Sequence, residues 1–434
     1  MNRFVHPLSS LLAAALVAAV AALLSGAAPG VRAQVAPAPA SAPAAAASGP
    51  TLRAEVGKPL QAAQDAVKAG NYKEALARLA EAEALPGLTP YEVFITQRLK
   101  GPAAFGAGDL ASATSQFEAV LASPLLAAVD RAPITETTIK LLLQQKEYAR
   151  AAEWMKPYLA ADANANSEIR KLYPQVLSVL GDHAGVLREL APQIAADAAA
   201  KRAPPEATLR LLAASQSALK DMPAYLSTLE RLASSTGKTE YWAELMARTV
   251  RRDGFADERL RLDVYRLRRA VGVPLDAGEL GDMAARAQQA GLPAEAQALL
   301  DEGFASVLLD KGDNLAADKK LRETASKAAA QDRATLAESE AGALKGKDGN
   351  AAANLGLAVS GTGAHERGLA LLLQGQAKGG LRRTDDALLH LGLVQWRAGK
   401  IDDAKRSFAA VQGSDGSADL ARLWGLYLAS PARK

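Results

Sequence analysis

Apolar and polar residues between Asp385 and Val411, which read DDALLHLGLVQWRAGKIDDAKRSFAAV, follow the period of two short helices. Gly392 leaves room on the first helix for a neighbouring helix to approach. Gly399 fits the turn, and Ala404 and Phe408 share one face of the second helix. Such a hairpin cannot bury its apolar stripe alone. The pattern therefore predicts stacked neighbours, and a stacked array offers a binding surface rather than a catalytic cleft.

The same order of turn, small residue and large apolar residue recurs along the chain. The first four turns are separated by 38, 38 and 35 residues. The predicted turns are at Gly70, Gly108, Lys146, Gly181, Lys220, Gly254, Gly291, Gly363 and Gly399. Because Gly291 and Gly363 lie 72 residues apart, one further hairpin with its turn near Lys327 is expected, unless residues 316–344 form one long helix. A last amphipathic helix, residues 418–428, is expected to cover the end of the array.

These hairpins resemble tetratricopeptide (TPR) repeats from Leu52 to Val411. The resemblance is poor from Thr239 to Asp276, where Arg259 replaces the small residue after Gly254, and the repeats exceed the usual length of about 34 residues. A related helical-hairpin solenoid is the alternative. The resemblance implies an all-α fold, a right-handed superhelical α-solenoid of about ten hairpins, with a concave face that binds a protein or peptide. The C-terminal half is similar to secreted proteobacterial TPR proteins, some of which are thought to serve TonB-type envelope machinery.

The N-terminal residues have the pattern of a secretory signal peptide. Arg3 precedes an apolar run of 14 residues from Leu11 to Leu24, and Val31 and Ala33 favour cleavage after Ala33. The run is shorter than the ~20 residues that cross a bilayer as a helix. We therefore expect an exported protein, periplasmic in a Gram-negative cell, with no membrane span after signal removal. An uncleaved inner-membrane anchor is the alternative.

The sequence divides into five segments by composition and repeat regularity. Residues 1–33 are the expected signal peptide, and residues 34–50 are an Ala/Pro tract expected to be a disordered linker. An N-terminal TPR-like array is predicted over 51–240, degenerate helical repeats over 241–345, and C-terminal TPR repeats with a capping helix over 346–434.

Composition excludes several classes of function. Removal of the signal peptide leaves 49 basic and 47 acidic residues, which does not favour a nucleic-acid partner. The chain has no cysteine, so disulfides, cysteine-bound metals, a thiol nucleophile and a lipidated cysteine are excluded. None of the four histidines is paired at metal-ligand spacing. We expect no metal and no cofactor.

Catalytic motifs are not found in the sequence. It contains neither G-x-S-x-G nor H-E-x-x-H, and the glycine-rich segment around Gly361 lacks the Lys-Ser/Thr pair of a phosphate-binding loop. Paired acids such as Asp385 and Asp386 open predicted helices, where they cap free N–H groups. The protein is expected not to be an enzyme. An envelope hydrolase with unfamiliar catalytic residues is the third alternative.

Arginines are most dense in the irregular repeats. This middle arginine cluster comprises Arg248, Arg251, Arg252, Arg259, Arg261, Arg266, Arg268 and Arg269. Residues three or four apart share a helix face, and the face predicted to line the concave surface carries Tyr241, Glu244, Arg248 and either Arg251 or Arg252. Arginines beside an aromatic ring suit carboxylates or an acidic peptide. The alternative is a solvated face with local ion pairs such as Glu244 with Arg248.

Trp396 and Arg397 occupy the corresponding position in the last regular repeat, where the indole could stack on a ligand or pack in the core. Together these features predict an exported scaffold or adaptor that binds a protein or peptide partner. The alternative is an architectural subunit of an envelope complex, for example beside a TonB-type transport system, that uses its convex face or its ends.

Overall fold

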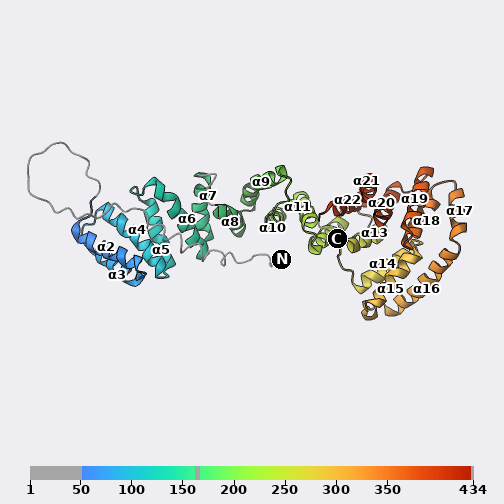
Figure 1. The fold of residues 1–434 in the computed structure, drawn as a ribbon, viewed down its shortest axis with the longest axis horizontal. Helices are drawn as coiled ribbons and strands as arrows, with labels where there is room; N and C mark the ends of the chain where they lie inside the picture. The colour runs from blue at the N-terminus through green and yellow to red at the C-terminus, as the bar shows by residue number, and fades with distance from the viewer. Residues whose placement is uncertain (1–50, 162–166, 432–434) are drawn as a thin grey trace, which may run out of the picture. The chain divides into compact units, whose positions relative to one another are not determined.

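The structure is a computed structural model that describes residues 51–161 and 167–431 (Figure 1). Within this part of the chain the fold is all-α, with 21 α-helices and no β-strand. The chain divides into two compact units, Met1–Ala191 and Pro192–Lys434, which we describe separately. The predicted signal peptide, the cleavage site after Ala33 and the linker 34–50 lie outside the described residues.

Unit 1 consists of short helices that pack in chain order. From α2 to α8 each helix contacts the next, and α2 also contacts α4. The helices are α2 Ala54–Lys68, α3 Tyr72–Glu83, α4 Pro90–Gly106, α5 Leu110–Ala122, α6 Ala128–Gln144, α7 Tyr148–Ala161, α8 Ser167–Val179 and α9 His183–Ala199, the last of which extends into unit 2.

Unit 2 continues with helix pairs and one 3-10 turn. Its helices are α10 Glu206–Ala218, α11 Met222–Thr236, α12 Thr239–Val250, α13 Asp257–Ala270, α14 Ala277–Gln289, α15 Pro293–Ala305, η1 Leu309–Lys311, α16 Leu315–Ala334, α17 Leu336–Lys345, α18 Asn350–Gly361, α19 His365–Lys378, α20 Thr384–Arg397, α21 Ile401–Ala409 and α22 Ser417–Ala429. Among the described residues, no helix combines the length and the apolar character needed to cross a bilayer.

All nine predicted turns join two helices through a residue with left-handed backbone angles. At Gly70, the glycine N–H donates to Val67 O at 3.0 Å and the N–H of Asn71 donates to Ala66 O at 2.8 Å. These two bonds satisfy carbonyls that the end of α2 would leave unpaired. The predicted turns are confirmed, including the two occupied by Lys146 and Lys220.

The residues predicted to pack between paired helices are buried. Ala75, Ala113 and Ala151 are fully buried, each on the second helix of its pair. A Cβ atom at Gly392 would lie 2.6 Å from the ring of Phe408, so only glycine leaves room for that ring. The small and large residues in the sequence therefore identify the helix pairs correctly.

The turn expected near Lys327 is wrong. Helix α16 runs through Lys327 to Ala334, and the helix is interrupted only at Thr335, before the short α17. No glycine or proline interrupts α16, and its alanines and lysines favour a continuous helix. High helix propensity therefore overrides the repeat spacing in this segment.

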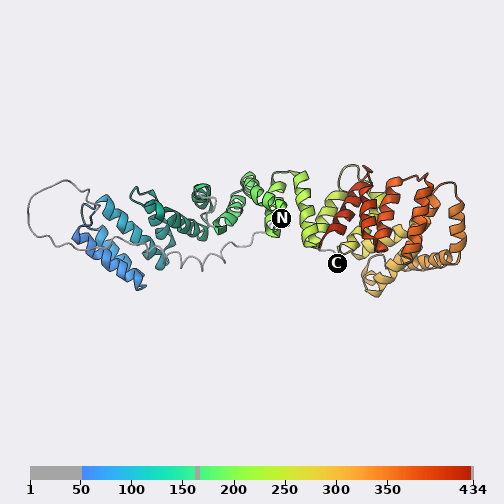
Figure 2. The ribbon, with the colours of Figure 1, turned by 45° about the horizontal axis from the view of Figure 1, so that its top comes forward.

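Helix α22 contacts both its neighbours and helices much earlier in the sequence. It packs on α20 and α21, as the predicted capping role requires, and also on α11 and α13. In Figures 1 and 2 the C-terminal helices lie beside α13 within unit 2. Trp424 of α22 packs on Trp396 and Phe408, and Tyr427 packs on Trp242 of α12. The irregular repeats are therefore in direct contact with the C-terminal ones.

The boundary between the two units lies inside α9, at Ala191 and Pro192. It does not coincide with the sequence boundaries at 240 and 345. The sequence boundaries mark changes in repeat regularity. The boundary between the units instead reflects which helices pack together, so it need not fall at the same residues.

Candidate functional site

Tyr241, Glu244 and Arg248 lie together along one side of α12. The Nε of Arg248 donates to Glu244 at 2.8 Å, one helical turn away. Its guanidinium lies over the ring of Tyr225 from α11, 5.4 Å from the centroid. The hydrogen bond to Glu244 raises the pKa of Arg248, so the guanidinium is charged at any physiological pH. The sequence predicted that these three residues share a face, and the ion pair between two of them is present.

Tyr241 connects α12 to the first helix of the preceding pair. Its hydroxyl donates to Glu206 of α10 at 2.7 Å, and the Nζ of Lys238 donates to the same carboxylate at 2.6 Å. Lys238 and Tyr241, in that order of effect, lower the pKa of Glu206. Burial, followed by the hydrogen bond to Glu206, raises the pKa of Tyr241, so its hydroxyl remains a donor.

Arg251 and Arg252 have different surroundings. Arg251 follows the last residue of α12 and is exposed, and within the described part of the chain its side chain has no hydrogen bond or ion pair. Arg252 instead pairs with Asp419 of α22 at 2.8 Å. We define the α10–α12 face as Glu206, Tyr225, Tyr241, Glu244, Arg248 and Arg251.

A second group of ionisable residues lies between α13, α15 and α20, of which Asp263, Arg266 and Glu295 are buried and His390 and Arg397 are half-buried. We call it the buried charge network, formed by Asp263, Arg266, Glu295, His390 and Arg397. Arg266, only 4% exposed, donates through Nε and Nη2 to both oxygens of Glu295 at 2.9 and 2.6 Å. Its Nη1 donates to Asp263 at 2.7 Å. The other oxygen of Asp263 faces His390 Nε2 at 3.3 Å, and Arg397 donates to Glu295 at 3.2 Å.

The charges in this network compensate one another. Burial alone would raise the pKa of Glu295, but Arg266 and then Arg397 lower it to about 2. Burial would likewise raise the pKa of Asp263, but His390 and Arg266 lower it far below its ordinary value. The two carboxylates are therefore ionised at neutral pH and held by two guanidiniums. This arrangement fixes three helices against one another.

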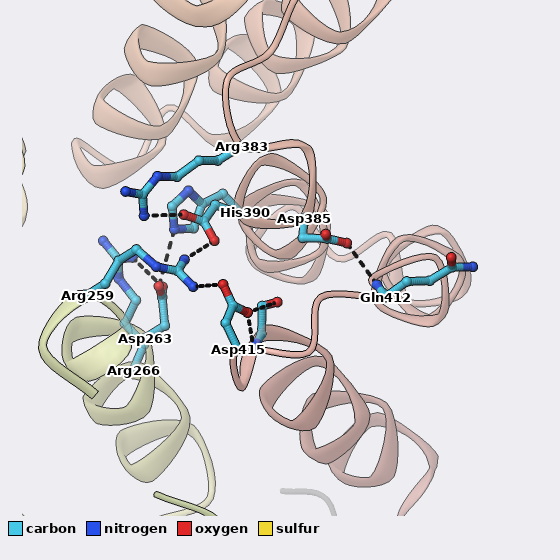
Figure 3. Close-up of polar contacts among 10 residues, drawn as sticks. Arg259, Asp263, Arg266, Arg383, Asp385, His390, Gln412 and Asp415 are labelled. Atoms are coloured by element: carbon cyan, nitrogen blue, oxygen red, sulfur yellow. Dashed lines mark hydrogen bonds and ion pairs between the residues drawn. The ribbon is translucent and has the colours of Figure 1, made fainter. Parts of the chain in front are cut away.

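Arg259 joins α13 to the C-terminal repeats (Figure 3). Its guanidinium donates to Asp386 of α20 and to Asp415 in the loop before α22, residues that are 127 and 156 positions away. Arg422 of α22 pairs with Glu230 of α11 in the same region of the fold. We call the pairs made by Arg252, Arg259 and Arg422 the closing contact. In this part of the middle arginine cluster, the arginines bind the protein's own carboxylates.

Trp396 and Arg397 lie inside this packed region. Trp396 packs on Trp424, with ring centroids 4.9 Å apart, and also contacts Tyr427. Arg397 belongs to the buried charge network, and burial lowers its pKa despite the opposing effect of Glu295. Both residues are half-buried, and the partners named here are on α15 and α22 rather than Tyr241 or Arg248. Their contacts correspond to the packing alternative considered for Trp396.

Sequence reasoning missed five residues that contact the middle arginine cluster or its partner Asp263: Glu295, His390, Asp386, Asp415 and Asp419. Each lies between 29 and 167 positions from its arginine or aspartate partner. Helical periodicity relates residues only three or four apart. An excess of arginine over acid in residues 248–269 was the one available sign that carboxylates from elsewhere are needed.

No family model and no curated protein matches this sequence. The description of the site therefore depends on its geometry alone. In residues 51–161 and 167–431, no group of three or more histidines and acids is arranged to hold a metal ion. The α10–α12 face carries the exposed guanidinium of Arg251 and the guanidinium of Arg248, which lies over the ring of Tyr225. Tyr241 lies on the same face. Such a surface can bind carboxylates through charge-assisted hydrogen bonds.

Proposed function

We propose that the protein is a non-enzymatic, TPR-like α-solenoid scaffold that binds a protein or peptide partner on its concave face. Pairs between successive hairpins support the solenoid. Arg53 pairs with Glu92, 39 residues later, Glu118 with Arg150, 32 residues later, and Glu206 with Tyr241, 35 residues later. These separations match the repeat length, as expected where equivalent helices of neighbouring hairpins lie side by side.

The α10–α12 face is the partner-binding surface that we propose. The observation that carries the proposal is that Arg251 is exposed and has no partner among residues 51–161 and 167–431, whereas Arg252, the next residue, pairs with Asp419. Arg248 on the same helix is already oriented by Glu244 and Tyr225. An acidic segment of a partner fits this surface, because arginine forks bind carboxylates in two-point contacts.

Preorganisation is the proposed source of affinity. Tyr225 and Glu244 restrict the rotamers of Arg248 before a partner arrives, and Glu206 restricts Tyr241. Ordering a free long side chain on binding costs about 0.5 to 1.5 kcal/mol, so side chains that are already ordered lose less. The repeats themselves provide a fixed support for these residues.

The cellular setting that we propose is the periplasm, with an envelope protein as partner. The signal-peptide pattern of residues 1–33 supports export. An architectural subunit that docks through its C-terminal end has less support, because Trp424 is 1% exposed and its ring packs within unit 2. That residue is not available to a second protein.

Charge reversal tests the proposal. The variant Arg248→Glu/Arg251→Glu should weaken partner binding at least tenfold, because two cations that meet acidic groups become anions. Arg252 is left unchanged, since its reversal would also break the pair with Asp419. Binding should be measured by pull-down from envelope extracts at two ionic strengths, followed by titration of the captured partner.

The matched control is Lys319→Glu/Lys320→Glu on α16. It changes the net charge by the same amount at two exposed lysines. Circular dichroism should be unchanged in both variants. Equal binding by wild-type protein and the arginine variant, or equal loss in the control, would rule out the α10–α12 face as the binding surface.

A further inference from the structure

A polar pocket of about 400 Å³ lies in unit 2, away from the α10–α12 face. It is formed where α14 begins, where η1 ends and where α16 begins. Its polar lining residues are Asp276, Lys311, Asp313, Asn314 and Asp318. We call it the α16 pocket.

Asp318 is the residue in this pocket that lacks an explanation in the fold. It is only 6% exposed, yet within the described part of the chain its carboxylate has no hydrogen bond and no ion pair. Burial raises its pKa, and no positive charge offsets that effect. Buried carboxylates are otherwise paired, as Glu295 and Asp263 are in this same unit. The carboxylate oxygens of Asp318 are reached by solvent at the pocket wall, so they can accept hydrogen bonds from a group outside the chain.

The opposite helix leaves room for this carboxylate. Gly281 of α14 faces it, and a Cβ atom at Gly281 would lie 2.8 Å from Oδ1 of Asp318. That distance is too short for the carboxylate to keep its position. A glycine inside a helix lowers the stability of that helix. Gly281 therefore has a cost to α14, and what it provides is the space that the Asp318 carboxylate occupies.

The charge of the α16 pocket favours a cation. Three carboxylates, from Asp276, Asp313 and Asp318, face one ammonium, that of Lys311. Asp276 already accepts the N–H of Glu279 at 2.8 Å as a helix cap, whereas the carboxylates of Asp313 and Asp318 accept no hydrogen bond within the described part of the chain. The described residues contain no group of three or more acids and histidines arranged for a metal. The pocket is also many times larger than the ~30 Å³ that one water occupies. An organic cation fits this charge and this volume.

We propose that the α16 pocket binds the primary ammonium group of a small organic cation, with the Asp318 carboxylate as its counter-ion. An ammonium donates three hydrogen bonds, and the lining supplies acceptors at Asp318, Asp313 and Asn314. This site goes beyond the scaffold function and does not depend on it. It would provide the scaffold with a small-molecule ligand separate from the partner-binding surface.

Calorimetric titration of the full chain with 1,5-diaminopentane tests the proposal, with 1,5-pentanediol as the uncharged probe of the same length. Wild-type protein should bind the diamine and not the diol. Asp318→Asn should weaken binding at least tenfold, and Gly281→Ala should do so with the charge retained, because its methyl displaces the carboxylate. Asp310→Asn, on the exposed η1 outside the pocket, is the matched control and should bind like wild type.

A stability measurement separates this role from a purely structural one. Without ligand, Asp318→Asn should melt at a higher temperature than wild type, because it removes an unpaired buried charge. The diamine should raise the melting temperature of wild type and not of Asp318→Asn. The proposal is overturned if wild type does not bind the diamine, if Asp318→Asn binds it equally, or if only calcium or inorganic phosphate binds at the pocket.

Discussion

Lysines occupy two turns where the backbone is left-handed. Lys146 has φ 62° and Lys220 has φ 60°, whereas the other seven predicted turns use glycine. A side chain in this region brings Cβ close to the following carbonyl, at a cost of roughly 1 to 2 kcal/mol. Both lysines are exposed, so no packing contact offsets that strain. The strain is local to each turn.

Replacing either lysine by glycine should therefore stabilise the protein. We expect Lys146→Gly and Lys220→Gly each to raise the free energy of unfolding by about 1 kcal/mol. Lys156→Gly, at an exposed position inside α7, is the control and should lower it by about 1 kcal/mol. Urea denaturation measures all three. A loss of stability in the two turn variants would show that the turns are not strained.

The buried charge network predicts a pH-dependent effect at Glu295. The pKa of this carboxyl is about 2, below its ordinary 4.5, so the unfolded chain takes up its proton at higher pH than the native chain does. The stabilisation is therefore complete above pH 4.5 and is lost as pH falls through 2. Glu295→Gln should remove this part of the acid sensitivity.

At neutral pH, Glu295→Gln should lower the free energy of unfolding by about 3 to 5 kcal/mol, because it leaves buried arginine charge uncompensated. Glu302→Gln is the matched control, since Glu302 pairs with Arg269 at the surface. This substitution should lower the free energy of unfolding by less than about 1 kcal/mol. Thermal or urea denaturation between pH 2 and 7 gives both quantities. Equal effects of the two substitutions would contradict the buried network.

At the scale of helix packing, alanine substitutions at Gly392 and at Gly425 are expected to change stability in opposite directions. A methyl at Gly392 would meet the ring of Phe408, whereas one at Gly425 inside α22 would have nothing within 4 Å. Gly392→Ala should destabilise by about 1 to 3 kcal/mol because α20 and α21 must separate. Gly425→Ala should stabilise by about 0.5 to 1 kcal/mol because alanine favours a helix. Melting temperatures that shift in the same direction would contradict this account of the pairing.

Sequence patterns predicted the helix pairs well because their determinants are local. A turn residue such as Gly70 and a small residue such as Ala75 act within one hairpin, so their positions could be predicted before the fold was known. Helix α16 departs from this rule, since local helix propensity carries it through the expected turn at Lys327. The site was only half predictable. Arg248 and Glu244 are one turn apart, whereas Arg259 meets Asp415 through folding of unit 2.

At the scale of the whole molecule, α22 links helices of unit 2 that are far apart in the sequence. It contacts helices adjacent to it in sequence and also α11 and α13. A chain that ends at Gln412 should therefore lose amide hydrogen-exchange protection in α11–α13, because the aromatic and ionic contacts of α22 are gone. Protection in α2–α7 of unit 1 should be unchanged. Loss of protection confined to α20 and α21 would mean that α22 is only an end cap.

The central claim is that the α10–α12 face binds a partner, and site-specific photocrosslinking in cells tests it most directly. A photoreactive residue at position 251 should give a discrete protein adduct that mass spectrometry can identify. That adduct should disappear in the Arg248→Glu background and should not form from a photoreactive residue at Lys319. The account is contradicted if position 251 gives no adduct, or if the adduct is unaffected by Arg248→Glu.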